Sequence, residues 1–88
     1  MGDTQVDMAH THSAEFSRDD KAGVWYVSET DFPGLVAEAA SERDLVRKIR
    51  ALVPDLYELN RHLFDESRLE AIALRLTASR LETICLKG

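Results

Sequence analysis

The longest periodic segment of this chain is amphipathic and extends from Ser41 to Asn60. Apolar residues recur in it at steps of three and four, which is the spacing of one face of an α-helix. The members of this stripe are Leu45, Ile49, Leu52, Val53 and Leu56. Ser41, with Asp44 three residues later, resembles a capping box and predicts the helix start, while Asn60 predicts its end. An apolar stripe has to be covered by another apolar surface, so this helix constrains the rest of the fold.

Pro54 falls inside the helical pattern. Proline lacks a backbone N–H and clashes with the preceding turn, so we expect a kink or a helix that restarts over Asp55–Leu59. Residues 61–68 are polar and predict a loop.

Three short segments before the helix are typical of β-strands. His10–Ser17 alternates weakly, Val24–Val27 has four residues of high β preference, and a third strand is expected from Leu35 to about Ala39. The polar segment Arg18–Gly23 predicts a hairpin turn between the first two strands. The segment Asp31–Gly34 ends the second strand, since its proline cannot donate to a ladder.

The tail over residues 69–86 supports two interpretations. Ile72, Leu74 and Leu76 alternate with less apolar residues, which suits a strand, whereas the many Ala, Leu, Arg and Glu residues favour a helix. The residues alone therefore predict three strands, one main helix and an undecided last element. This is an α+β fold in which the helix packs on one face of a small antiparallel sheet. We expect residues 1–8 to be a flexible N-terminus and residues 9–88 to form a single domain.

The composition restricts the classes of function. The chain has 88 residues, enough for one domain, and a formal net charge of −5. Nucleic-acid binding by the chain on its own is not expected, because such binding needs a cationic surface. The one local candidate is a basic helix face, which we interpret as a solvated face. Its residues are Arg43, Arg47, Lys48 and Arg50.

Several features indicate where the protein resides. A single cysteine, Cys85, allows no internal disulfide, as is usual in a reducing cytoplasm. The segment Met1–His12 has no apolar core, so it is not a signal peptide, and no apolar run approaches the roughly 20 residues that span a bilayer. We therefore expect a soluble cytoplasmic protein without a membrane partner. Cys85 lies in an apolar stretch and predicts a buried, inert thiol.

The sequence gives only weak indications of a catalytic or metal site. His10 and His12 would point the same way on a strand, but no third ligand follows at a set spacing, so we expect solvated histidines. The acidic pairs are better explained by turn and loop solvation than by a two-metal nuclease site. These pairs are Asp19 with Asp20, Glu29 with Asp31, and Asp65 with Glu66. The sequence therefore predicts no catalytic residue, no cofactor and no metal, and a protein that is not an enzyme.

Trp25 and Tyr26 are the notable aromatic pair. Adjacent strand residues face opposite sides, so one should enter the core and the other should remain on the outer face of the sheet. An exposed aromatic and aliphatic patch on an open sheet is a reasonable site for a partner protein or for a second copy of the chain.

An ordered set of features runs from Gly23 into the helix. A glycine and an aromatic strand (Gly23–Ser28) are followed by an acidic-apolar-Pro-Gly turn (Asp31–Leu35), the segment Ala37–Ala39 and a helix opened by serine. This set resembles the HicB-like antitoxin domains. The helix segment Arg50–Asn60 and the tail Arg75–Glu82 are similar to a sub-group catalogued as domain of unknown function 1902.

The resemblance implies a β-β-β-α-β fold, a degraded relative of the ribonuclease H fold, and it favours a strand in the tail. It also implies a protein-binding module that neutralises a small basic HicA-like ribonuclease toxin. We expect the chain to depart from many such antitoxins in having no DNA-binding domain of its own. The alternatives are an orphan domain that associates with itself as a homodimer or higher oligomer, and a metal-dependent nuclease. The residues expected to bind a partner are Trp25, Tyr26, Asp31, Phe32, Pro33 and Gly34.

Overall fold

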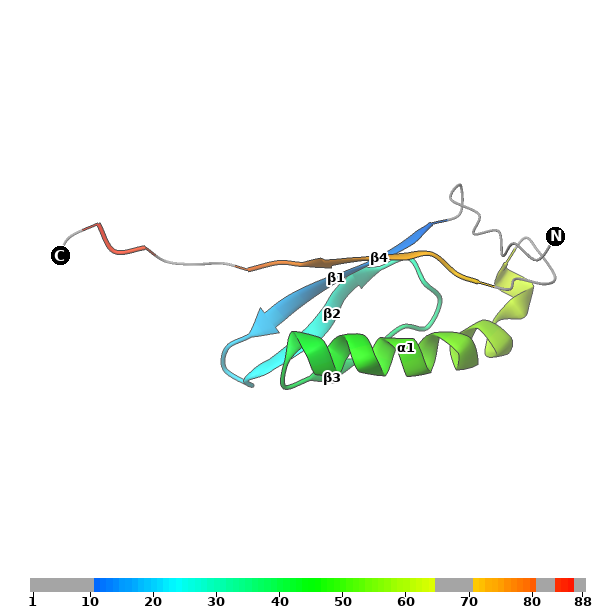
Figure 1. Ribbon diagram of the computed structural model, residues 1–88, viewed down its shortest axis with the longest axis horizontal. Helices are drawn as coiled ribbons and strands as arrows, with labels where there is room; N and C mark the ends of the chain where they lie inside the picture. The colour runs from blue at the N-terminus through cyan, green and yellow to red at the C-terminus, as the bar shows by residue number, and fades with distance from the viewer. Residues whose placement is uncertain (1–10, 65–70, 81–83, 87–88) are drawn as a thin grey trace.

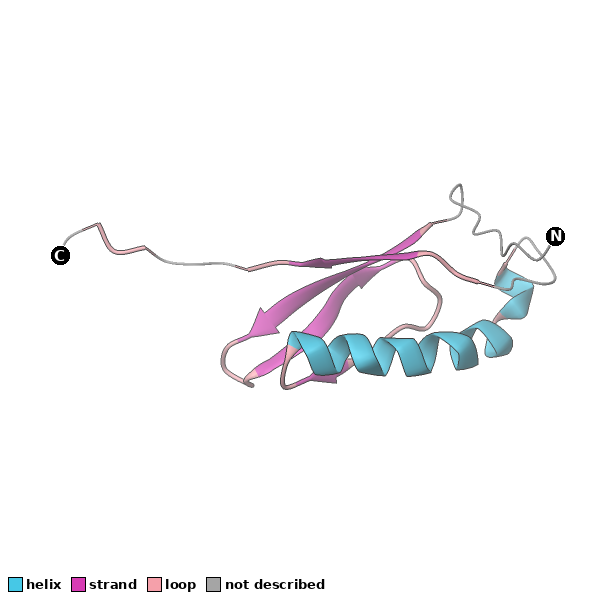
Figure 2. Cartoon of the chain, viewed as in Figure 1, coloured by secondary structure: helices cyan, strands magenta, loops and turns pink. Residues whose placement is uncertain are grey.

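The computed structural model describes residues 11–64, 71–80 and 84–86. One long helix, α1, packs on one face of a four-stranded sheet (Figures 1 and 2). The elements are β1 (His12–Asp19), β2 (Val24–Thr30), β3 (Glu38–Ala39), α1 (Glu42–Leu59), the 3₁₀ turn η2 (Arg61–Leu63) and β4 (Leu74–Ala78). The predicted α+β fold and the β-β-β-α-β order are confirmed. The expected flexible segment 1–8 lies outside the described residues.

The sheet is mixed, with strand order β3-β2-β1-β4. The pairs β1–β2 and β2–β3 are antiparallel, but β4 runs parallel to β1. The expectation of a wholly antiparallel sheet is therefore wrong for its last strand. The physical reason is the long connection through α1, which returns the chain to the far edge of the sheet in the direction of β1.

The undecided tail forms a strand over Leu74–Ala78. Its backbone is held by β1: the N–H of His12 donates to the carbonyl of Ala73 at 2.9 Å, and the N–H of Ser79 donates to the carbonyl of Phe16 at 2.7 Å. Pairing with β1 thus overrides the helix preference of the local residues.

The β1–β2 hairpin closes at the predicted polar turn. The Asp19 carboxylate accepts hydrogen bonds from the backbone N–H groups of Lys21 and Ala22, each at 3.1 Å. Gly23 has a φ of 70°, a left-handed conformation that glycine adopts without steric cost. Both predictions for this segment, the hairpin and its turn chemistry, are confirmed.

Helix α1 begins as predicted. The side chain of Ser41 accepts a hydrogen bond from the backbone N–H of Asp44 at 3.1 Å, and Asn60 caps the C-terminal end. Pro54 lies within one continuous helix, so the alternative of a restart at Asp55 is wrong. The proline is exposed at the surface and borders the space between α1 and β4.

The core lies between α1 and the sheet. Its buried residues are Ala14, Phe16, Trp25, Phe32, Leu35, Ala39, Leu45 and Ile49. The remaining members of the predicted stripe, Leu52, Val53 and Leu56, are partly buried against this cluster. The face of α1 that is buried against the sheet is therefore the face that the sequence predicted. No helix in the described part of the chain is long and apolar enough to cross a membrane.

An aromatic cluster closes the end of the core near the C-terminus of α1. The His12 ring centroid lies 5.3 Å from that of Phe32 and 5.8 Å from that of Phe64, and the Tyr57 centroid lies 4.9 Å from that of Phe64. Part of the predicted loop, Arg61–Leu63, is the turn η2 that brings Phe64 there. His12 is thus packed among aromatic rings rather than solvated as expected. His10 lies outside the described residues.

Candidate partner-binding surface

Trp25 and Tyr26 separate onto opposite faces of β2. Trp25 is buried under α1, with the guanidinium carbons of Arg18 and Arg80 at 6.0 and 5.9 Å from its ring centroid. Tyr26 lies on the outer face and is 38% exposed. The predicted division between core and outer face is confirmed, and of the two rings only that of Tyr26 is exposed at the surface.

Tyr26 lies at the centre of a small exposed patch. Val24 and Val36 flank it on the outer side, and Val36 is 85% exposed. The carboxylate residues Asp19 and Glu38 border the same shallow hollow, which encloses about 460 Å³. We call these five residues the Tyr26 patch. It combines an apolar centre with an acidic rim.

The segment Asp31–Gly34 has a structural role in the folded chain. Phe32 is buried in the core, and the neighbouring Asp31 carboxylate accepts a hydrogen bond from the backbone N–H of Ser13 at 2.9 Å. Pro33 is partly buried, and Gly34 is exposed with a φ of 77°. This turn therefore presents few apolar atoms to a partner.

The structure does not bring the predicted binding residues into one site. Tyr26 is opposite Ser17 in the β1–β2 register, whereas the Asp31 turn contacts Ser13. Four residues along a strand correspond to about 13 Å, so the Tyr26 patch and the turn are separate surfaces. Val36 was not among the predicted binding residues, because the sequence placed it inside the third strand. That strand covers only Glu38–Ala39, and Val36 lies before it.

The acidic residues do not converge on a metal site. Asp19 is at the hairpin turn, Asp20 pairs with Arg18 at 3.1 Å, and Glu29 is opposite Glu15 near the other end of the sheet. Among the described residues no group of three or more His, Cys, Asp or Glu side chains is placed to hold a metal ion. Asp65 and Glu66 lie outside the described residues.

The basic side chains of α1 are exposed, as expected for a solvated face. Arg43, Arg47, Lys48 and Arg50 all lie on the surface. Lys48 donates from Nζ to the backbone carbonyl of Glu38 at 2.6 Å, which fastens α1 to β3. One of the four therefore has a structural partner across the fold.

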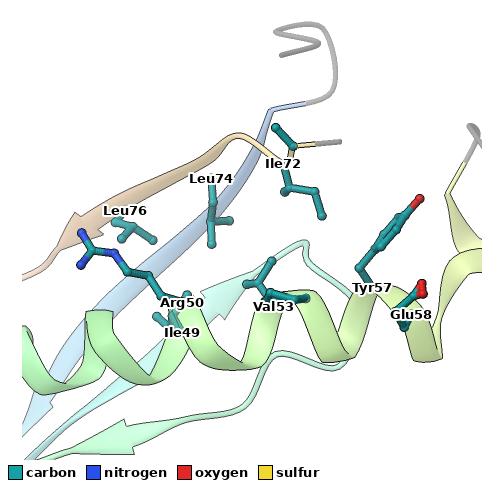
Figure 3. Close-up of a pocket in the computed structure, with 10 residues that line it drawn as sticks. Ile49, Arg50, Val53, Tyr57, Glu58, Ile72, Leu74 and Leu76 are labelled. Carbon is teal, nitrogen blue, oxygen red and sulfur yellow. The ribbon is translucent and has the colours of Figure 1, made fainter. Parts of the chain in front are cut away.

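A second apolar surface, which the sequence did not indicate as a site, lies between α1 and β4. Figure 3 shows Ile49 and Val53 on the helix facing Leu74 and Leu76 on the strand. The groove between them encloses about 620 Å³ and extends to Tyr57. The alternation of Ile72, Leu74 and Leu76 along the tail could have indicated this apolar surface, but from the sequence it predicted only a strand.

The chain beyond β4 is exposed. Ile84 and Leu86 are 75% and 95% exposed, and Cys85 between them is exposed as well. The predicted burial of the Cys85 thiol is therefore wrong. The reason is that residues 84–86 lie past the end of the sheet and away from α1 (Figure 1).

Comparison with known proteins identifies two relationships. A family model described as a domain of unknown function (DUF1902) matches residues 13–86. The chain is also similar to the crystal structure of the hypothetical protein TTHA1013 from the extremely thermophilic bacterium Thermus thermophilus. The identity is 32% and the TM-score 0.60, and the match covers 82% of this chain and 99% of that one. A search of curated proteins gave no match.

Proposed function

The chain belongs to the family described as a domain of unknown function (DUF1902), and on this premise, together with the Tyr26 patch, we propose that it is a protein-binding module. The observation that carries the proposal is the exposed aromatic and aliphatic centre of the patch, bordered by carboxylates. Protein interfaces commonly place aromatic residues at the centre and polar groups at the rim.

The charge of the chain supports a basic partner. The formal net charge is −5, and the two charged residues of the Tyr26 patch, Asp19 and Glu38, are acidic. Complementary charge steers association and selects the partner. Together with the resemblance to HicB-like antitoxins, this favours a small basic ribonuclease toxin of the HicA type, which the module would neutralise in the cytoplasm without catalysing a reaction itself.

The experiment is co-expression with a short basic protein encoded beside this chain. We expect a complex that inhibits the ribonuclease activity of the partner and weakens as salt is raised, because screening reduces the attraction between the charges. Tyr26→Ser and Val36→Ser should each weaken binding about tenfold or more. Leu59→Ser is the matched control, since Leu59 is 77% exposed but lies at the C-terminal end of α1.

Equal binding by the Tyr26, Val36 and Leu59 variants would reject the Tyr26 patch as the site. A complex whose partner keeps full ribonuclease activity would reject neutralisation while leaving protein binding in place.

The second candidate function is self-association, which the sequence also predicts. One observation favours it: Leu76, Ile84 and Leu86 are exposed apolar residues on or beyond β4, the strand at the opposite edge of the sheet from β3. Exposed apolar surface of this kind is often covered by a partner subunit.

A further inference from the structure

The open edge of β4 can accept another strand. One side of β4 pairs with β1, and no described strand lies on its other side. The carbonyl of Ala73 and the N–H of Ser79 both point to β1. Because backbone groups alternate in direction along a strand, those of Leu74 and Leu76 point to the open edge. An edge with such groups is a template for a further strand.

The groove between α1 and β4 lies along this edge. Most of its lining consists of apolar side chains from both elements, including Val53 on the helix and Leu74 and Leu76 on the strand, and Arg50 and Glu58 add charged groups on the helix side (Figure 3). A strand added to β4 would therefore place every second side chain over the groove, on the same face as Leu74 and Leu76.

The segment Ile84–Leu86, which we call the arm, has the matching pattern. Ile84 and Leu86 are two residues apart, so an extended backbone directs both side chains to one side. They also occupy even-numbered positions, as Leu74 and Leu76 do, with Ala78, Arg80 and Glu82 at the even-numbered positions between the two pairs. Both are largely exposed within this copy of the chain.

The arm of the same copy is badly placed to fill this groove. Arg80 Nη2 lies 3.5 Å from Glu42 Oε1, so the chain leaves the domain beside the N-terminal end of α1, whereas the groove extends toward Tyr57 near the other end. To return, the chain would have to reverse after Arg80. Between Arg80 and Leu86 the sequence has no Gly, Pro, Asn or Asp, the residues that favour reversals.

We propose that two copies of the chain exchange arms about a two-fold axis. The arm of each copy pairs antiparallel with the open edge of β4 in the other and seats Ile84 and Leu86 in the α1–β4 groove. The inference rests on self-association, the second of the two proposed functions. A two-fold axis forms each contact twice, so β4, the arm and the groove of both copies take part.

The first test is the mass of the full chain in solution by light scattering over a range of concentrations. We expect the wild type at twice the chain mass. The double variant Ile84→Glu/Leu86→Glu should raise the dimer dissociation constant by roughly 100-fold or more, because two apolar anchors are lost from each groove. The matched control is Leu59→Glu, which adds a charge at an exposed leucine outside the arm and groove and should leave the dimer intact.

A second test uses charge complementation. Leu76→Lys changes the groove side of the contact. We expect this variant to fold, because the Leu76 side chain is 37% exposed within one copy of the chain. We expect this variant alone, like the arm variant, to be monomeric. Mixing the two should restore a heterodimer, since the glutamates of one arm meet the lysine of the other groove and the reciprocal contact is the native one.

The outcomes distinguish self-association in general from arm exchange in particular. A wild-type chain that stays monomeric overturns both self-association and arm exchange. A dimer that survives in the arm variant overturns arm exchange alone, and its loss in Tyr26→Ser would then assign self-association to the Tyr26 patch. Two monomeric variants that fail to form a heterodimer when mixed also overturn arm exchange.

Discussion

The Oδ1 atom of Asp31 accepts a hydrogen bond from the backbone N–H of Ser13 across 2.9 Å. Asp31 follows β2 and Ser13 lies near the start of β1, so the bond fixes the turn after β2 to the neighbouring strand. Thr30 adds a second link, because its hydroxyl donates to the Ser13 carbonyl at 2.7 Å. These bonds position Phe32 for burial in the core.

Removal of the Asp31 acceptor should destabilise the domain. We expect Asp31→Ala to lower the free energy of unfolding by about 1–2 kcal/mol, the usual cost of losing a charge-assisted hydrogen bond at a partly solvated site. Asp31→Asn keeps an acceptor oxygen and should cost about half as much or less. Urea unfolding followed by Trp25 fluorescence measures both. An equal loss in the two variants would mean that charge, and not the acceptor, matters.

Leu45 should be the most costly leucine in α1 to truncate. Its exposed fraction is 0%, so Leu45→Ala leaves a cavity between helix and sheet and should lower the free energy of unfolding by about 2–5 kcal/mol. Leu59→Ala removes the same atoms from a side chain that is 77% exposed and should change stability by no more than about 0.5 kcal/mol. Thermal and urea unfolding of the pair test this, and similar losses would contradict the packing described.

Two glycines allow a comparison of backbone strain with side-chain crowding. Gly23 and Gly34 have φ angles of 70° and 77°, so alanine at either position is strained by about 1–2 kcal/mol. A Cβ at Gly23 meets no atom within 4 Å, whereas at Gly34 it lies 3.3 Å from Leu56 Cδ2. We therefore expect Gly34→Ala to destabilise more than Gly23→Ala in urea unfolding. The reverse order would contradict the close approach of the turn to α1.

Pro54 should weaken the helix that contains it. It cannot donate to the carbonyl four residues earlier, that of Arg50, and it is exposed. Pro54→Ala should therefore raise the free energy of unfolding by about 1–3 kcal/mol. Denaturation and far-ultraviolet circular dichroism measure this. A less stable variant would show that the contacts of the ring in the α1–β4 groove outweigh the lost hydrogen bond.

Local chemistry was enough to predict much of the fold. Ser41 caps α1 as its side chain and spacing indicated, and Leu45 and Ile49 are buried on the predicted stripe. The opposite placement of Trp25 and Tyr26 followed from strand alternation alone. Each of these predictions depends on residues that are near neighbours in the chain, and such relations can be read from a sequence.

Contacts between segments that are far apart in the sequence could not be predicted in this way. The direction of β4 could not be predicted, since it depends on where α1 returns the chain, and the packing of His12 depends on Phe64, far along the chain. The predicted binding residues also proved to be dispersed, with Phe32 in the core and Tyr26 on the outer face.

The sequence by itself determined the elements of this protein and their apolar faces, because side-chain periodicity and capping act over a few residues. Only the tertiary structure decided which surfaces remain open. The Tyr26 patch includes Val36 because β3 is short, and the α1–β4 groove exists because β4 joins β1 as an edge strand. Exposure depends on what the rest of the chain covers, and that is a property of the whole packed domain.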